Sequence, residues 1–288
     1  MNEIFVLPPG SGLSSLAASY DVVLCDVWGV LHNGVQAWAS AADALTRFRA
    51  GGGTVILVSN APRPVRDVET QLATIGVPPE SFDGIITSGA VTRHEIDRRG
   101  VRFIHHIGAH RDGGLFEGIE LVQPNEAQLA VVTGLEDDTT EVPEDYRDRL
   151  LAMQAQGLDL ICANPDRVVE RGDQLVWCAG AVADLYEKVG GNVLHIGKPF
   201  PAIYERAVQM AEELRGAAVP KARVLAIGDS MITDVAGANT FGVDCLFVTG
   251  GIHSGDLGHP PTSEAYQAIL KAAQPQPVGW THRLSWDA

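Results

Sequence analysis

Residues 21–34, DVVLCDVWGVLHNG, decide how the fold is interpreted. Val22 to Cys25 form an unbroken apolar run, which is typical of a strand buried on both faces of a parallel sheet. Asp26 ends this run and Gly29 follows three residues later, so we expect the carboxylate where the strand passes into a turn. Trp28 stands two residues beyond Asp26. The stretch therefore predicts a buried strand with an acidic group at its carboxyl end.

Composition and charge narrow the classes of protein to consider. The 288 residues are 45% hydrophobic and 20% charged, and they suffice for one large domain or two medium ones. A net charge of −15 argues against general affinity for nucleic acid or membrane surfaces, but a local metal ion or lysine still permits a small phosphorylated ligand. The N-terminal segment has no basic leader and is interrupted by prolines, so we expect a cytoplasmic protein. We expect buried free thiols at Cys25, Cys162, Cys178 and Cys245.

Short β-branched runs alternate with helical stretches, which predicts a doubly wound parallel α/β sheet. Strands of this sheet are expected at 22–26, 54–60, 83–89, 222–229 and 243–250, with helices at 37–50 and from about 62 to 75. A second α/β unit is expected between them. Its strands are predicted at 102–108, 129–134, 158–164 and 174–178, with helices at 142–157 and 180–191. The predicted division is a core of 1–89 and 195–288 with an inserted domain at 90–194.

Polar residues follow several of the predicted strands. Asp26 ends the first, Ser59 and Asn60 end the second, and Asp229 follows a later one. Ligands of open parallel sheets bind at the carboxyl ends of the strands, so these side chains should converge. Phosphoryl transfer requires charge neutralisation and alignment, which a carboxylate nucleophile, a hydroxyl group, a lysine and bound Mg²⁺ would supply. For Asp21 we expect a surface or capping role, because it precedes the strand and lies at the opposite sheet end.

Four segments, in order, resemble the motifs of the haloacid dehalogenase (HAD) superfamily: DVWGV, VSN, GKPFP and GDSMITDVAGAN. The resemblance spans nearly the whole chain and implies a Rossmann-like core with an inserted cap of class II. It implies that Asp26 is the nucleophile, which forms an aspartyl-phosphate. Ser59 is then expected to hold the transferring phosphoryl group, and Lys198 to stabilise its charge.

The same resemblance implies a Mg²⁺ site. Its ligands are expected to be the carboxylates of Asp26, Asp229 and Asp234 with the backbone carbonyl of Trp28, which does not depend on the side chain. His105, His106 and His110 have no matching cysteine or carboxylate pattern, so we expect no metal site there.

The predicted cap resembles the IIA branch of sugar-phosphate, nucleotide and pyridoxal-phosphate phosphatases through ITSGA, CANPD and CAGAVADLYEKVGG. The nearest resemblance is to a sub-branch that also carries DVWGV. Such a cap closes over the site and selects the substrate, and caps of this class often take part in homodimers. Asn60, Asn164 and Asp166 are candidates for binding phosphate or substrate. The alternative for Asn164 and Asp166 is an Asx turn.

Trp28 replaces the aspartate that protonates the leaving alcohol in phosphatases of the superfamily, and indole is neither an acid nor a base near neutral pH. Dehalogenase members also lack this aspartate, but Asp229 and Asp234 preserve a metal-binding pattern that they lack. Phosphonatase members use a cap lysine soon after the first motif, and this chain has no lysine before Lys188. His32 is our hypothesis for a replacement acid and base.

The leading hypothesis is therefore a Mg²⁺-dependent phosphatase of small phosphorylated metabolites. A phosphometabolite-binding or regulatory protein that has lost efficient turnover is one alternative. The other is a phosphotransferase, in which the aspartyl-phosphate is passed to an acceptor other than water.

Overall fold

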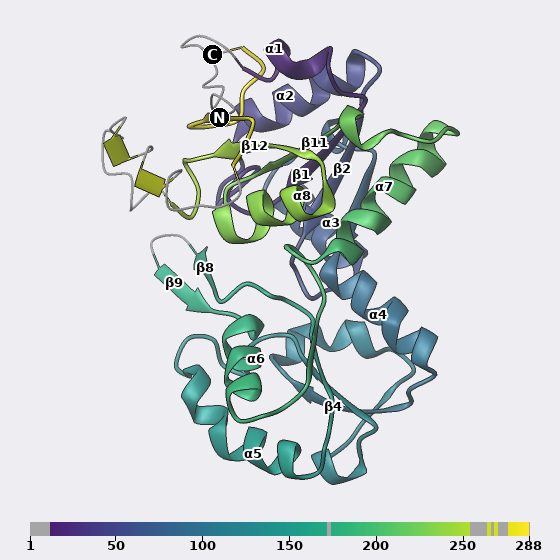
Figure 1. Ribbon diagram of the computed structural model, residues 1–288, viewed down its shortest axis with the longest axis vertical. Coiled ribbons are helices and arrows are strands. Elements are labelled where there is room, and N and C mark those ends of the chain that lie inside the picture. Colours follow the sequence, from purple (N-terminus) through teal and green to yellow (C-terminus); the bar gives the residue numbers. More distant parts are fainter. Residues whose placement is uncertain (1–11, 172–173, 254–263, 266–267, 270–275, 288) are drawn as a thin grey trace. The chain divides into compact units, whose positions relative to one another are not determined.

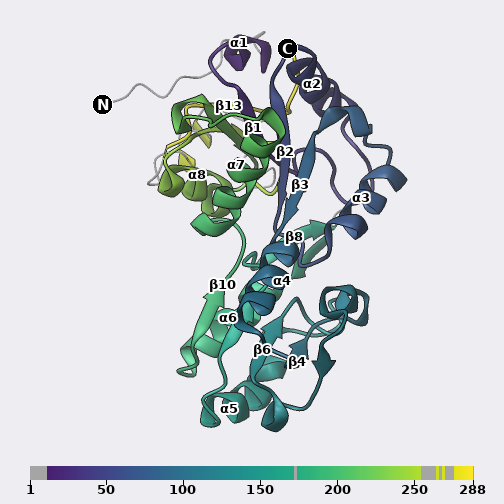
Figure 2. The same cartoon turned by 90° about the vertical axis from the view of Figure 1, so that its right-hand side faces the viewer.

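A computed structural model describes residues 12–171, 174–253, 264–265, 268–269 and 276–287. The chain forms two compact units (Figures 1 and 2). The first unit comprises residues 1–59, 69–86 and 204–288, and the second comprises 60–68 and 87–203. The prediction that 90–194 acts as a cap stays a prediction.

Over the described residues, the first unit is built on a six-stranded sheet, in which β13, β12, β11, β1 and β2 run parallel. β1 lies inside this sheet between β11 and β2, and all five of its residues are buried. Val22 pairs with Val224 on one side and with Thr54 on the other. The sheet order is β13 (Gly279–Thr281), β12 (Asp244–Val248), β11 (Val224–Gly228), β1 (Val22–Asp26), β2 (Thr54–Ser59) and β3 (Gly84–Thr87).

Helices follow the strands of this sheet at short spacing. In α2, Ala41, Leu45 and Phe48 recur at helical spacing and are all buried. A Cβ atom on Gly53 would lie 2.2 Å from the Phe48 ring, so this glycine lets the chain turn directly from α2 into β2. The helices are α1 (Ser14–Ala17), α2 (Ala39–Ala50), α3 (Val65–Thr74), α7 (Pro201–Arg215) and α8 (Ala236–Phe241), with short turns η1 (Pro79–Ser81), η5 (Lys221–Arg223) and η6 (Met231–Val235).

The described part of the second unit contains a five-stranded parallel sheet and an antiparallel hairpin. The sheet order is β10 (Val193–His195), β7 (Leu160–Cys162), β6 (Leu129–Val132), β4 (Phe103–Ile107) and β5 (Glu120–Leu121), and the hairpin is β8 (Val168–Arg171) with β9 (Gln174–Trp177). Leu129 and Val131 of β6 belong to one apolar cluster, and Ala130 and Val132 to another. Both faces of this sheet are therefore covered, as parallel sheets require.

Helices of the second unit supply the two apolar layers. Leu150 and Met153 of α5, with Tyr186 of α6, pack in one cluster, and Ile96 of α4 packs in the other. The helical elements are α4 (Ser88–Arg99), η2 (His110–Phe116), η3 (Pro124–Glu126), η4 (Pro143–Tyr146), α5 (Arg147–Ala155) and α6 (Ala179–Lys188).

The predicted α/β fold is confirmed, and so are the buried free cysteines. The predicted strand at 83–89 is too long, because Thr87 caps α4 by accepting a hydrogen bond from Ala90 N–H at 2.9 Å. The C-terminal segment, whose role the sequence did not indicate, supplies β13. Within the described ranges, no helix has the length and apolarity needed to cross a membrane.

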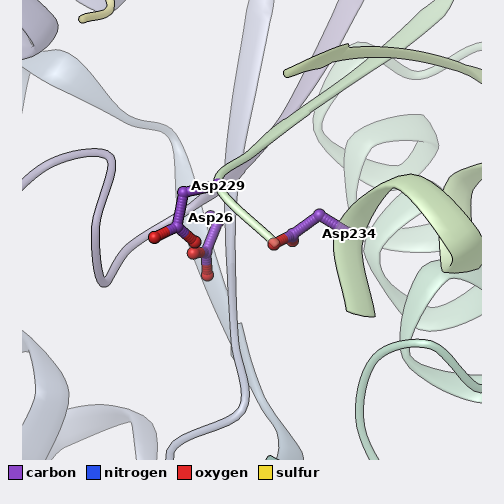
Figure 3. Close-up of side chains that lie close together, drawn as sticks. All are labelled: Asp26, Asp229 and Asp234. Atoms are coloured by element: carbon purple, nitrogen blue, oxygen red, sulfur yellow. The ribbon is translucent and has the colours of Figure 1, made fainter. Parts of the chain in front are cut away.

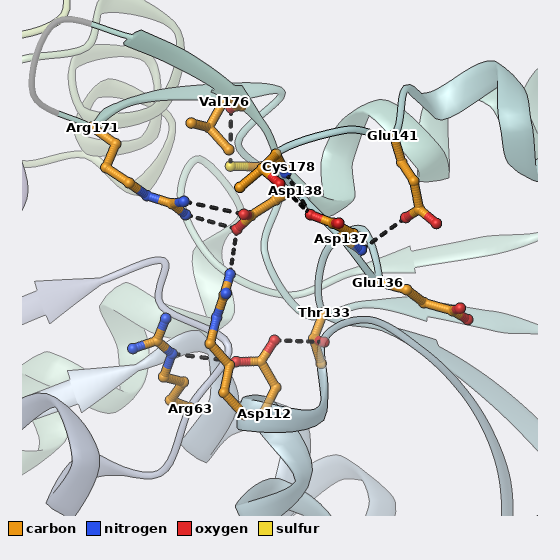
Figure 4. A network of polar contacts seen from close by, with 12 residues as sticks. Arg63, Asp112, Thr133, Glu136, Asp137, Asp138, Glu141, Arg171, Val176 and Cys178 are labelled. Atoms are coloured by element: carbon orange, nitrogen blue, oxygen red, sulfur yellow. Dashed lines mark hydrogen bonds and ion pairs between the residues drawn. The ribbon is translucent and has the colours of Figure 1, made fainter.

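A polar network runs through the second unit (Figure 4). Asp112 accepts hydrogen bonds from Arg63 Nε at 3.3 Å and from the Thr133 hydroxyl at 3.0 Å. His106 Nε2 lies 2.8 Å from Thr133 Oγ1. Because the hydroxyl proton is directed to Asp112, His106 donates its Nε2–H to that oxygen. Burial lowers the pKa of His106 to about 4 and raises that of Asp112.

The low pKa of His106 makes stability depend on pH. Its folded-state pKa lies below the unfolded value, so its contribution is complete above about pH 6.5 and falls as the pH drops toward 4. We expect the wild type to lose about 2 kcal/mol more stability than His106→Gln between pH 7.5 and 5. Urea unfolding at both pH values measures this difference, and equal losses would contradict it.

Candidate functional site

Parallel pairing in the first unit brings two acidic residues to one sheet edge. Asp26 ends β1, Asp229 directly follows β11, and these strands are hydrogen-bonded neighbours with Cys25 opposite Ile227. Asp234 projects toward them from η6 (Figure 3). Among the described residues, these three buried carboxylates form the one group whose ligand oxygens all lie within 4.8 Å of one another.

Glycines let the backbone approach Asp229 closely. A Cβ atom on Gly29, whose φ is +80°, would lie 1.9 Å from Asp229 Oδ2, and one on Gly251 would lie equally close. Asp229 Oδ2 also accepts a hydrogen bond from Ile252 N–H at 2.7 Å. The turn after β1 and the loop after β12 therefore together fix this carboxylate.

Asp234 is held by the turn that precedes it. Its Oδ2 accepts a hydrogen bond from Ser230 N–H at 3.1 Å, and a Cβ atom on Gly228 would lie 2.1 Å from its Cγ. The Ser230 hydroxyl in turn accepts from Thr233 N–H at 3.2 Å, which caps η6. The GDSMITD spacing thus folds as a tight turn into a helix, with its two aspartates converging.

The cluster has the donor chemistry of a cation site. Like charges this close repel one another strongly when buried, and a divalent cation would remove that repulsion. Carboxylate oxygens are the ligands that Mg²⁺ and Ca²⁺ prefer. The three aspartates predicted as metal ligands are therefore brought together in a suitable form, whereas the role of the Trp28 carbonyl stays a prediction.

Ser59 reaches the same sheet edge from the other side of β1. It ends β2, where Asp26 pairs with Val58, and it is buried. The first unit therefore places the predicted nucleophile between the predicted phosphate-holding hydroxyl group and the other two carboxylates.

Trp28 packs within its own loop. Its ring meets the His32 ring edge-on at 4.9 Å between centroids, and a Cβ atom on Gly34 would lie 2.6 Å from the indole. His32 is 1% exposed and accepts a hydrogen bond from Gly34 N–H at Nδ1, 2.8 Å away. Burial lowers the pKa of His32 to about 4, so the imidazole is neutral at pH 7. These contacts brace the loop, and the acid–base role of His32 stays a prediction.

The remaining predicted site residues belong to the second unit. Asn164 Oδ1 accepts a hydrogen bond from Asp166 N–H at 3.1 Å, so the Asx turn left open by the sequence is present. Asn60 donates to Asp166 Oδ1 at 3.0 Å and also contacts the backbone of Lys198. Contact of these residues with a substrate stays a prediction.

The sequence reasoning missed the loop after β12. Besides the Ile252 contact, His253 Nε2 accepts a hydrogen bond from Met231 N–H at 3.4 Å, beside the acidic turn. A signal that could have found it is the pair Gly250-Gly251 soon after a buried strand, a pattern that permits close backbone approach.

Comparison with known proteins agrees with this architecture. A family model described as haloacid dehalogenase-like hydrolase matches residues 23–121, and a HAD-hydrolase-like model matches 195–271. A solved structure of a haloacid dehalogenase-like hydrolase from Brucella suis 1330 is 44% identical, with a TM-score of 0.86, over 95% of this chain and 99% of that one.

Two curated relatives are more distant. D-glycerol 3-phosphate phosphatase of Mycobacterium tuberculosis is 28% identical over 93% of this chain and 77% of its own length. Ribonucleotide monophosphatase NagD of Escherichia coli K12 is 26% identical over 81% of this chain and 89% of its own length.

The fold and the acidic cluster together define an α/β protein with an inserted second α/β unit and a candidate cation site. The chain belongs to the haloacid dehalogenase-like hydrolase family, in its class IIA branch. Membership of the sub-branch with DVWGV stays a prediction.

The repulsion within the cluster can be tested by changing one carboxylate. Asp234→Asn keeps an oxygen that can accept from Ser230 N–H but removes one negative charge. We expect this variant to melt above the wild type in a chelator, because less charge is buried, and below it in millimolar Mg²⁺. Thermal melts with and without Mg²⁺ measure both effects. Equal responses of the two proteins to Mg²⁺ would exclude Asp234 as a ligand.

Proposed function

We propose that this protein is a Mg²⁺-dependent phosphoric monoester hydrolase that acts on small phosphorylated metabolites of the sugar-phosphate or nucleotide type. The observation that carries the proposal is the convergence of Asp26, Asp229 and Asp234, with Ser59 at the same sheet edge. The names of the two curated relatives, both phosphatases of small phosphate esters, support the choice of reaction.

In the proposed reaction, a carboxylate oxygen of Asp26 attacks phosphorus and the ester P–O bond breaks, leaving an aspartyl-phosphate and an alkoxide. Attack of water on phosphorus then releases inorganic phosphate and restores the carboxylate. Ser59 would donate a hydrogen bond to the phosphoryl oxygens, and Lys198 would balance their charge. Asp26, Asp229 and Asp234 would hold Mg²⁺, which would supply positive charge to offset that of the phosphoryl group.

The source of the proton for the leaving alkoxide distinguishes this protein from a phosphatase that has an acid at position 28. The departing alkoxide must acquire a proton, and Trp28 carries an indole that cannot provide one. General acid–base assistance is typically worth about 10²–10⁴ in rate, so its loss slows turnover without removing nucleophilic attack. Because position 28 is a tryptophan, two alternatives stay open: a binding or regulatory protein, and a phosphotransferase.

The proposed nucleophile is tested with a panel of phosphate esters, assayed with and without Mg²⁺. We expect Asp26→Asn to lower phosphate release by about 10³ or more, because the amide is a poor nucleophile and the covalent route is lost. Release that persists in this variant would refute Asp26 as nucleophile. No release from any ester, together with Mg²⁺-dependent ligand binding, would instead support the binding protein. Transfer of phosphate to an added alcohol would support the phosphotransferase.

The lack of an acid at position 28 predicts a steep dependence on the leaving group. Aryl phosphates, whose leaving groups are weak bases, should turn over about 10² or more faster than alkyl phosphates. If His32 supplies the proton instead, His32→Ala should slow alkyl esters selectively and leave aryl esters nearly unchanged. Equal losses for both ester types, or no loss at all, would remove His32 from the chemistry.

A further inference from the structure

The side-chain amide of Asn60 holds the backbone of Lys198. Asn60 Oδ1 accepts a hydrogen bond from Lys198 N–H at 2.7 Å, and Asn60 Nδ2 donates to the Lys198 carbonyl oxygen at 3.1 Å. The same Nδ2 donates a second hydrogen bond to Asp166 Oδ1 at 3.0 Å. One side-chain amide therefore binds both the backbone N–H and the backbone carbonyl of a residue 138 positions further along the chain.

The partners fix the orientation of this amide. One partner is a donor, the Lys198 N–H, and two are acceptors, the Lys198 carbonyl and the Asp166 carboxylate. If the amide were flipped, its NH₂ group would face the N–H donor and its oxygen would face the two acceptors, so none of the three hydrogen bonds could form. The two backbone groups of Lys198 favour this orientation of Asn60, and Asp166 reinforces it with a charged acceptor, whose hydrogen bond is of the stronger, charge-assisted kind.

The packing leaves little freedom around the contact. Asn60 is 4% exposed and Lys198 is 3% exposed. Gly197 adopts a φ of +130°, and a Cβ atom there would lie 2.6 Å from Asn60 Oδ1. A buried amide whose partners are removed leaves unpaired polar groups, which is costly. The chain around Lys198 is accordingly shaped to fit the Asn60 side chain.

We propose that Asn60 is a positioning residue for Lys198, oriented by Asp166, and that its side chain acts by fixing the lysine backbone. The expectation that Asn60 binds phosphate stays a prediction, which the variants described below separate from the positioning role. The inference rests on the proposed function only in so far as Lys198 serves the phosphoryl group. The position of Lys198 itself can be measured independently of activity.

The scarcity of lysine makes that measurement direct. The chain has four lysines, and Lys198 is buried whereas Lys188 is exposed. An amine-acylating reagent followed by peptide mass spectrometry gives a rate for each site. We expect Asn60→Ala to raise the acylation rate of Lys198 about fivefold or more and to leave that of Lys188 unchanged. An unchanged rate at Lys198 would overturn the proposal, even in a fully active phosphatase.

Exchanging the amide and the carboxylate between positions 60 and 166 distinguishes a positioning role of Asn60 from phosphate binding. Asn60→Asp places a second carboxylate against Asp166 and should loosen Lys198, lowering kcat by about 10-fold to 100-fold. Adding Asp166→Asn supplies a donor for the new carboxylate and should recover at least part of both kcat and the slow acylation. If the side chain at position 60 bound phosphate, the new negative charge would instead lower kcat regardless of the residue at position 166.

A matched control lies in the same unit. Asn192 Nδ2 donates to Asp159 Oδ1 at 2.9 Å on the exposed surface. Asp159 and Asn192 directly precede the parallel strands β7 and β10, whereas Asp166 and Lys198 follow these strands. Asn192→Asp alone and combined with Asp159→Asn should leave Lys198 acylation and kcat unchanged. If the double variant Asn60→Asp with Asp166→Asn recovered neither kcat nor slow acylation of Lys198, Asp166 would be excluded as the orienting group. A wild type without phosphatase activity but with the expected acylation pattern would refute the proposed function and leave the positioning role standing.

Discussion

Three carboxylates buried within 4.8 Å of one another are the constraint on which the rest of this structure depends. Their mutual repulsion opposes folding, so the surrounding backbone must hold them in place. The sheet does this by pairing β1 with β11, which fixes two of them at adjacent strand ends. Hydrogen bonds from Ile252 N–H and Ser230 N–H then hold the carboxylates of Asp229 and Asp234.

Position 28 shows how a large side chain is accommodated within its own loop. The Trp28 ring is accommodated against His32 and beside Gly34, where a larger residue would collide with it. The space for the indole therefore comes from the turn after β1, and the three-aspartate cluster remains assembled. A tryptophan at this position is therefore compatible with an assembled cluster of three carboxylates.

The parts of the fold that the sequence predicted are those with strong local signals. β1, β2 and β11 are continuous apolar runs, and their ends place Asp26, Ser59 and Asp229 at one edge by topology alone. β5 and β13 were missed because they are two or three residues long and exist through pairing with distant strands. The contact between Asn60 and Lys198 could not be predicted either, because no local sequence pattern shows which group 138 residues away an amide will bind.

The predicted site residues of the two units are held in place in different ways. Asp26, Asp229 and Asp234 are set by strand ends and turns, so their geometry follows from the backbone of the first unit. Lys198 lies in a loop, and a long flexible side chain on a loop would lose much of its value as a fixed charge. Anchoring its backbone through Asn60 shortens the mobile part to the side chain alone. Under the proposed function, this anchoring would give a loop lysine the fixed position that the carboxylates obtain from the sheet.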